Sequence, residues 1–203
     1  MEIIVTHTSS DFDAFAGMVA ASKIYPGAKL ILPNAINSNV RKFISLYEDE
    51  LPLIHEPGDI DFSTVKKVIM VDTRIASRTG ATEKILKGHK AEVVAFDHHI
   101  KTGKDFLPDK DYSREIGAST TILVEMIRDK DIAISSLEAT LFLAWIYEDT
   151  GSFTYPGTTS EDMEAAAYLL GKDANLFIVL KFLNLSLTAI QHELLEKLIM
   201  ITA

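Results

Sequence analysis

The stretch EIIVTHTSSDFD, residues 2–13, decides the fold prediction. Its first half, residues 2–7, is a short run rich in β-branched residues. Residues 11–25 then carry apolar side chains at helical spacing, and Ser10 or Asp11 is available to cap that helix. The stretch therefore predicts a strand, a loop and a helix in succession.

The same alternation continues along the chain. Apolar runs predict strands at residues 28–33, 65–71 and 91–96, and helical patterns lie between them near residues 37–48 and 80–87. Strands that alternate with helices indicate a parallel sheet with helices on its faces. We therefore predict an α/β fold, a Rossmann-like parallel sheet flanked by helices.

After Gly117 the pattern becomes helical only. The predicted helices of this C-terminal part cover residues 118–129, 136–148, 159–170, 176–183 and 188–201. Ser135 with Glu138, and Thr159 with Asp162, have the spacing of helix starts. The helical part therefore completes the predicted α/β fold.

One domain accounts for most of the chain. Residues 105–113 are charged and poor in aliphatic side chains, which predicts a surface loop after the strand at 91–96. We expect residues 1–185 to form a single domain. Residues 186–203 then form a C-terminal helix that would link to a second domain, which the sequence does not contain.

The composition restricts the class of protein. With 203 residues and 47% hydrophobic side chains, the chain can build a sizeable core. The chain has no cysteine and no apolar run near the roughly 18 residues that span a bilayer, so we expect a soluble, cytoplasmic protein that does not bind membranes. The net charge of −9 argues against a broad basic surface for duplex DNA, whereas a short anionic substrate fits.

Acidic and histidine side chains gather where the predicted strands end. Residues 7–13 follow the first strand, Asp72 follows the strand at 65–71, and Asp97-His98-His99 follows the strand at 91–96. Asp149 lies where a predicted helix ends in a glycine turn. Because ligands of open parallel sheets bind at the carboxyl ends of the strands, we expect these side chains to converge on one crevice.

Carboxylates and imidazoles of this kind indicate a metal site. Bridging carboxylates can neutralise two divalent cations and hold them about 3.5 to 4 Å apart. Without cysteine, the ligands are oxygen and imidazole nitrogen, which favour Mn²⁺ and also admit Mg²⁺ or Co²⁺. We predict a site for two Mn²⁺ ions.

Four motifs in order resemble those of the DHH phosphoesterase superfamily. They are His7-x-x-x-Asp11-x-Asp13, Asp72, Asp97-His98-His99 and Asp149-Thr150-Gly151. The superfamily includes RecJ-like exonucleases, nanoRNA and cyclic-dinucleotide phosphodiesterases, and family II inorganic pyrophosphatases. The resemblance spans residues 1 to about 185.

Three further segments narrow the resemblance. The segments VDTR at residues 71–74, GASTT at 117–121 and YEDTGSFTY at 147–155 resemble the DHH module of large bacterial proteins. In those proteins the module precedes CBS domains and a tRNA nucleotidyltransferase or poly(A) polymerase-like region. The Gly-Gly-Gly-His signature of the superfamily's second, substrate-gripping domain is absent from the sequence. We therefore expect a catalytic domain without its usual second lobe.

The resemblance also implies roles for individual residues. One metal would be held by His7, Asp11, Asp72 and Asp149, and the other by Asp13, His98, Asp72 and Asp149. A water or hydroxide between the metals would attack phosphorus in line. His99 would contact the phosphate or the leaving oxygen, and Asp97 would orient an imidazole. Arg74 and Arg78 would clamp the phosphate, although ion pairing or solvation explains either arginine equally well.

Three functions remain open at this stage. The first is a manganese-dependent, exonuclease-like phosphodiesterase that hydrolyses short oligonucleotides or dinucleotides. The second is a nucleotide- or RNA-binding module of a larger tRNA nucleotidyltransferase-like protein. The third is an inorganic pyrophosphatase, although the lysine- and arginine-bearing domain of those enzymes is not found. His55, His89 and His192 lack comparable context, and Leu141, Phe142 and Trp145 have the spacing of core residues.

Overall fold

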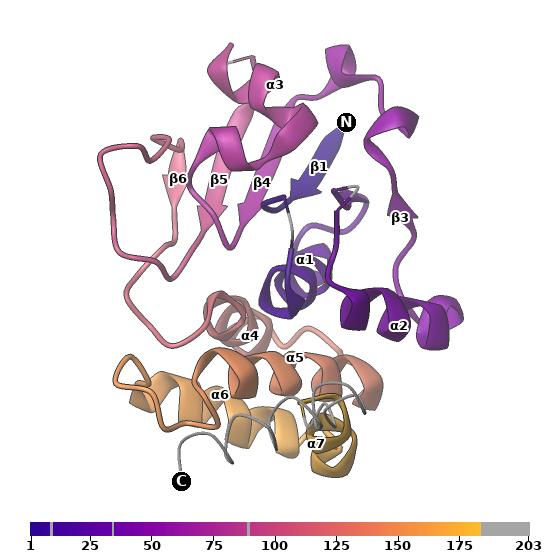
Figure 1. Cartoon of the computed structure of the whole chain (residues 1–203), viewed down its shortest axis with the longest axis vertical. Helices are drawn as coiled ribbons and strands as arrows, with labels where there is room; N and C mark the ends of the chain where they lie inside the picture. The colour runs from indigo at the N-terminus through magenta and orange to yellow at the C-terminus, as the bar shows by residue number, and fades with distance from the viewer. Residues whose placement is uncertain (9, 34, 89, 184–203) are drawn as a thin grey trace, which may run out of the picture.

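The computed structural model describes residues 1–183 except residues 9, 34 and 89 (Figure 1). A parallel sheet forms the centre of this part of the chain, with the strand order β3-β2-β1-β4-β5-β6. The strands are β1 (Glu2–Val5), β2 (Lys29–Ile31), β3 (Ile54–His55), β4 (Lys67–Val71), β5 (Glu92–Phe96) and β6 (Lys110–Asp111). The predicted α/β fold with a Rossmann-like parallel sheet is therefore confirmed.

Helices surround the sheet and extend beyond one of its faces (Figure 1). The α-helices are α1 (Phe12–Ile24), α2 (Ser38–Tyr47), α3 (Glu83–Lys87), α4 (Ser119–Asp129), α5 (Ser136–Asp149), α6 (Ser160–Leu170) and α7 (Leu176–Leu183). Short 3-10 helices are η1 (Glu48–Glu50), η2 (Pro57–Asp59), η3 (Phe62–Thr64), η4 (Ala76–Arg78) and η5 (Gly80–Thr82). None of the helices described is long and apolar enough to cross a membrane. The predicted helix at residues 188–201 lies outside the described residues.

The two faces of the sheet bury alternate residues of each strand. In β4, Ile69 and Val71 face the larger core with α1, α4 and α5, whereas Val68 and Met70 face a smaller core with α3. This alternation is the period-two pattern of a strand buried on both faces. Trp145 of α5 lies in the larger core, 4.1 Å from Phe12 between ring centroids, so the predicted core role of Trp145 is confirmed.

Local signals predicted several helix ends. Asp11 is the N-cap of α1, and its carboxylate accepts a hydrogen bond from the main-chain N–H of Ala14. Ser135 and Glu138 form a reciprocal capping box at the start of α5. These caps satisfy main-chain N–H groups that have no partner within the first turn of a helix.

The shortest strands were not predicted. β3 and β6 have two residues each, too few to show a periodic pattern. The prediction of a surface loop at residues 105–113 was wrong in part, because β6 lies within that range and pairs with β5. The carboxylate of Asp109 accepts the main-chain N–H of Val93, and Lys110 forms an ion pair with Glu92. The predicted helix at residues 80–87 is divided between η5 and α3.

Candidate metal centre

The sequence motifs meet at the carboxyl edge of the sheet. Because β1, β4 and β5 are parallel neighbours in register, Val5 lies beside Met70, and Val71 beside Phe96. The chain leaves these strands directly into the segments that carry His7, Asp72 and residues 97–99. The order of the strands reverses between β1 and β4, which is the position where open α/β sheets bind ligands.

The first group of candidate ligands consists of His7, Asp11 and Asp72. His7 Nε2 lies 3.2 Å from Asp72 Oδ2 and 3.9 Å from Asp11 Oδ1. On the other side of the ring, Nδ1 donates a hydrogen bond of 2.9 Å to the carbonyl of Thr8. That hydrogen bond fixes the tautomer, so that the lone pair of Nε2 faces the carboxylates.

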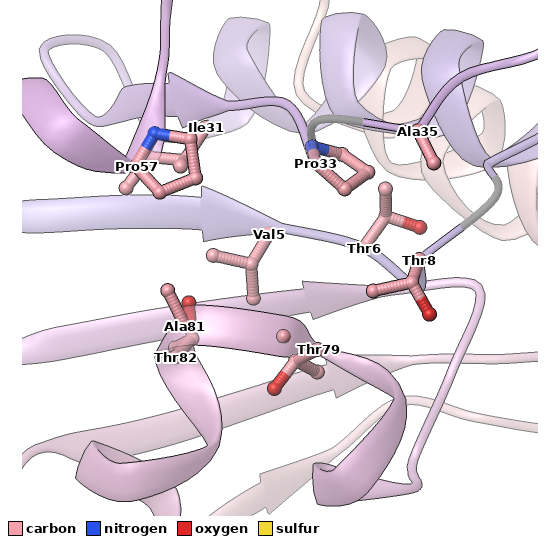
Figure 2. A pocket seen from close by; sticks show the side chains of 11 residues that line it. Val5, Thr6, Thr8, Ile31, Pro33, Ala35, Pro57, Thr79, Ala81 and Thr82 are labelled. Carbon is pink, nitrogen blue, oxygen red and sulfur yellow. The ribbon is translucent and has the colours of Figure 1, made fainter.

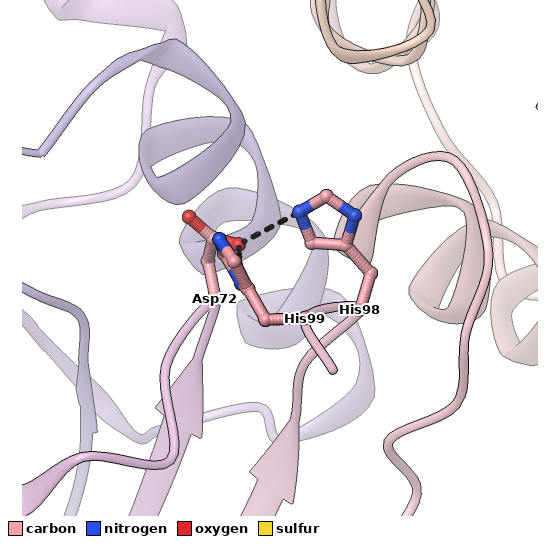
Figure 3. Close-up of side chains that lie close together, drawn as sticks. All are labelled: Asp72, His98 and His99. Atoms are coloured by element: carbon pink, nitrogen blue, oxygen red, sulfur yellow. Dashed lines mark ion pairs between the residues drawn. The ribbon is translucent and has the colours of Figure 1, made fainter. Parts of the chain in front are cut away.

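The second group consists of Asp13, His98 and Asp149. His98 Nε2 lies 3.3 Å from Asp149 Oδ2, and His98 Nδ1 lies 3.2 Å from the carbonyl of Ile116. Asp72 connects this group to the first, because its Oδ1 lies 3.5 Å from His98 Nε2 (Figure 3). Its Oδ2 lies 3.2 Å from His7 Nε2. The two oxygens of Asp72 are therefore placed as a bridge requires.

Asp72 adopts an unusual main-chain conformation. Its φ angle is 58°, in the left-handed region, which costs a residue other than glycine on the order of 1–3 kcal/mol unless its surroundings hold it. The N–H of Asp72 donates to the carbonyl of Phe96 at 2.8 Å, and the Ser119 hydroxyl donates to Asp72 Oδ1 at 2.9 Å. The structure therefore holds this carboxylate from both its main chain and its side chain.

The carboxylate of Asp13 binds the N-terminus of helix α4. The main-chain N–H groups of Ser119 and Thr120 donate to the two carboxylate oxygens of Asp13, at 3.2 and 3.3 Å. The N-cap residue, Ala118, has no side chain that could do so. Asp13 thus serves as a cap from a separate helix, and the helix dipole of α4 favours its negative charge. No role was predicted for Ser119 from the sequence. The available signal was Ala118, which cannot cap α4 with its side chain, followed by Ser-Thr-Thr.

The electrostatics of the cluster fit divalent cations. Burial, followed by the charges of Asp13 and Asp72, raises the pKa of Asp149 to about 11. Burial and the charge of Asp72 likewise raise the pKa of Asp13 to about 7. Carboxylates crowded in this way repel one another unless a proton or a cation lies between them. Two imidazoles and several carboxylates, without thiolate, are a donor set that suits Mn²⁺ or Mg²⁺. The residues present therefore fit the predicted metals.

His99 belongs to a third group of candidate ligands, with Asp72 and His98, and its Nδ1 lies 3.7 Å from Asp72 Oδ1. His99 Nδ1 donates to Asp97 Oδ1 at 2.7 Å, and this hydrogen bond raises the pKa of His99. Burial acts against ionisation of Asp97, but hydrogen bonds from His99 and the charges of His99 and Arg74 hold its pKa below the ordinary value. The ring of His99 is half exposed, so its Nε2 is available to a ligand.

The two arginines lie in different surroundings. Arg74 is buried, its Nε lies 3.4 Å from Asp97 Oδ2 and 3.7 Å from Asp105 Oδ2, and its Nη2 donates to the carbonyl of His99. Arg74 therefore joins the segments that follow β4 and β5. Arg78 is partly exposed, and its charge opposes in part the rise in the pKa of His99 that Asp97 causes. Phosphate binding by either arginine stays a prediction.

A cavity of about 470 Å³ opens beside these groups. The residues that line it include Arg74, Arg78, Asp97, His98, His99 and Ile100. Imidazoles and guanidinium groups on its walls make the cavity suitable for an anion. The arrangement can therefore bring a phosphoryl group to the candidate metal ligands.

Comparison with known proteins assigns the family. Residues 2–146 match the DHH family, N-terminal domain. The chain is 38% identical over 200 residues to an A-adding tRNA nucleotidyltransferase of Geobacter sulfurreducens, covering 98% of this chain and 23% of that protein. It is 30% identical over 217 residues to a cyclic-di-AMP phosphodiesterase of Bacillus subtilis, covering 96% of this chain and 32% of that protein.

Solved structures share the fold. An exopolyphosphatase-related protein of Bacteroides fragilis superposes with a TM-score of 0.74 at 20% identity, covering 92% of this chain and 57% of that chain. A putative family II inorganic pyrophosphatase of Methanococcus jannaschii gives a TM-score of 0.70 at 21% identity, covering 90% of this chain and 60% of that chain. At such identities the likeness shows the fold alone.

The parallel sheet and the family match over residues 2–146 define a phosphoesterase-type fold. This chain belongs to the DHH family. The chain spans 23% and 32% of the length of the two curated relatives described above. The resemblance drawn from the four sequence motifs is thereby confirmed.

Proposed function

We propose that this domain is a phosphodiesterase that hydrolyses short oligonucleotides or dinucleotides with two divalent cations, Mn²⁺ being preferred. The observation that carries the proposal is the position of Asp72, whose two oxygens face His7 on one side and His98 on the other. Both groups lie at the carboxyl edge of the sheet, beside a cavity whose lining includes Arg78, His98 and His99.

The proposed ligands are divided between the two ions. His7 and Asp11 would hold one ion, Asp13, His98 and Asp149 would hold the other, and Asp72 would bridge them. Asp149 is grouped with Asp13 and His98, so a second bridge through Asp149 stays a prediction. Bound cations supply Lewis acidity to the phosphoryl oxygens and lower the pKa of an attacking water.

His99 is the proposed proton donor to the leaving oxygen. Asp97 accepts the Nδ1 proton of His99 at 2.7 Å, and this hydrogen bond raises the pKa of His99. Arg74 positions Asp97 through the ion pair described above. His99 lines the cavity, where a proton on its Nε2 would pass to the leaving oxygen as the P–O bond breaks.

Hydrolysis of a dinucleotide in the presence of Mn²⁺ tests the proposal. We expect mononucleotide release by the intact chain and a loss of at least 100-fold in kcat/KM in Asp13→Asn, because one ligand group loses its buried charge. Glu164→Gln, which changes an exposed carboxylate of α6, is the matched control. Release of phosphate from pyrophosphate but no mononucleotide from the dinucleotide would contradict the proposed substrate.

A second candidate function rests on the A-adding tRNA nucleotidyltransferase of Geobacter sulfurreducens. Because 98% of this chain matches part of that longer protein, the domain could bind a nucleotide or RNA for an attached domain. Metal binding with no turnover of dinucleotide or pyrophosphate would favour this binding function.

A further inference from the structure

A second cavity, of about 250 Å³, lies over β1 on the face of the sheet that carries η5 (Figure 2). We call it the β1 cavity and define it by Val5, Ile31, Pro33, Pro57 and residues 79–82. Figure 2 shows the two prolines on one side of β1 and the segment with Thr79, Ala81 and Thr82 on the other. The β1 cavity shares no lining residue with the cavity beside His98 and His99.

The lining of the β1 cavity is uncharged and mostly apolar. Among the residues that the structure describes, those that line it are aliphatic, threonine, proline or glycine. The hydroxyl of Thr6 donates to the carbonyl of Val71 and that of Thr79 to the carbonyl of Ala76, both at 2.8 Å. Two of the hydroxyls are therefore used within the protein, and the cavity offers methyl groups and proline rings. Such a surface suits a neutral group that is largely apolar.

The β1 cavity is lined by buried residues at its base and by exposed residues at its rim. Val5, Ile31 and Thr82 are buried, whereas Thr8, Ala35 and Ala81 at its rim are exposed. An internal packing defect would be closed on all sides. The exposed rim therefore gives a ligand access.

The rim is joined to the candidate metal centre through one residue. The carbonyl of Thr8 accepts the hydrogen bond from His7 Nδ1 at 2.9 Å, and the N–H of Thr8 donates to the carbonyl of Arg78 at 2.7 Å. Thr8 thus lies between a proposed metal ligand and Arg78, which lines the cavity beside His98 and His99. Thr8 therefore places the rim of the β1 cavity next to the candidate metal centre.

We propose that the β1 cavity binds the base of a nucleotide whose phosphate lies at the metal centre. The proposal rests on the proposed function, and it adds the place where the base of the substrate binds. A base is planar, uncharged and apolar on its two faces, which matches the proline rings and methyl groups of the lining. Pyrophosphate and polyphosphate have no part that would occupy this cavity.

The test compares the affinities of adenosine monophosphate and ribose 5-phosphate, measured by calorimetry in the presence of Mn²⁺. Burial of one base predicts that the intact chain binds the nucleotide about tenfold more tightly. Ala81→Trp fills the cavity from its exposed rim and should remove this difference. Ala133→Trp, an exposed alanine in the segment before α5, is the matched control and should keep it.

Equal affinities in the intact chain, or an unchanged preference in Ala81→Trp, would overturn the base site and leave the proposed phosphoesterase intact. If neither phosphate compound binds, the proposed function fails, and adenosine alone then tests the cavity. Methyl NMR signals of Val5 and Ile31 should shift on addition of adenosine. Unshifted signals at saturating adenosine would refute the inference.

Discussion

At the scale of single residues, the conformation of the main chain and its hydrogen bonds help to orient the candidate metal ligands. Asp72 holds a left-handed φ of 58° and receives the Ser119 hydroxyl, while Asp13 receives two N–H groups of α4. These contacts orient the carboxylates before any ligand arrives. Preorganised ligands bind with a smaller entropic cost.

Ser119→Ala tests this orientation of Asp72. Loss of the hydrogen bond to Asp72 Oδ1 should weaken Mn²⁺ binding about tenfold, the usual effect of removing a group that orients a metal ligand. Calorimetry of Mn²⁺ binding measures the effect. Ser136→Ala, at the exposed start of α5, should bind Mn²⁺ as the intact chain does. An affinity unchanged in Ser119→Ala would contradict the positioning role.

The raised pKa of Asp13 predicts how stability depends on pH in the metal-free protein. The ordinary pKa is 3.8 and the folded value about 7, so the folded state binds more protons than the unfolded state between these values. Stability should therefore fall as the pH rises from about 4 to 7. Thermal unfolding should show a smaller fall in Asp13→Asn, and Mn²⁺ should restore stability at pH 7 and above. A profile identical in both proteins would refute the assignment.

At the scale of elements, close approaches set the distance between ligand-bearing segments. A Cβ added at Gly17 of α1 would lie 2.5 Å from Val71 Cγ1 of β4. Since α1 carries Asp13 and β4 leads into Asp72, the absence of a side chain at residue 17 lets the two carboxylates approach. The sequence alone could not reveal this contact, because it joins residues 54 positions apart.

Gly17→Ala should separate α1 from β4. Although alanine favours helices, overpacking against Val71 should lower the free energy of unfolding by about 1–3 kcal/mol. Denaturant unfolding checks the value, and Mn²⁺ binding should weaken in parallel. Gly103→Ala, where an added Cβ meets nothing within 4 Å, is the control. Stabilisation by Gly17→Ala would contradict the account.

Asp162 holds the C-terminal helices to the rest of the domain. This buried carboxylate accepts the N–H groups of Gly117 and Thr159 and the hydroxyls of Thr121 and Thr159. Asp162→Ala leaves these donors without partners and should lower the free energy of unfolding by about 3 kcal/mol. Urea unfolding of this variant and of Glu164→Ala, an exposed control, measures the difference. A loss below about 1 kcal/mol would show that water replaces the carboxylate.

The sequence predicted long elements and strand-end motifs better than short elements and contacts. Thr159 with Asp162 was predicted as a helix start, and the structure adds that Asp162 also binds Gly117 and Thr121. Such contacts depend on tertiary packing, which local patterns do not encode. The β1 cavity was missed for the same reason, since its walls come from β1, β2 and the segment after η4.

At the scale of the whole molecule, the carboxylates at the carboxyl edge of the sheet contribute to the net charge of −9. The carboxylates of the candidate metal centre repel anions unless cations neutralise them, so metal and phosphate should bind in sequence. The family relatives are three to four times longer than this chain. An attached lobe that covers the open cavity would raise substrate affinity and leave the metal ligands in place.

Calorimetric titration of Mn²⁺ into metal-stripped protein tests the central claim, a dinuclear centre bridged by Asp72. Two bound ions are expected in the intact chain and in the exposed control Asp129→Asn. Asp72→Asn keeps a side chain that tolerates the left-handed conformation and removes the charge, so it should weaken both ions together. Two ions with unaltered affinity in Asp72→Asn, or no Mn²⁺ bound by the intact chain, would contradict the claim.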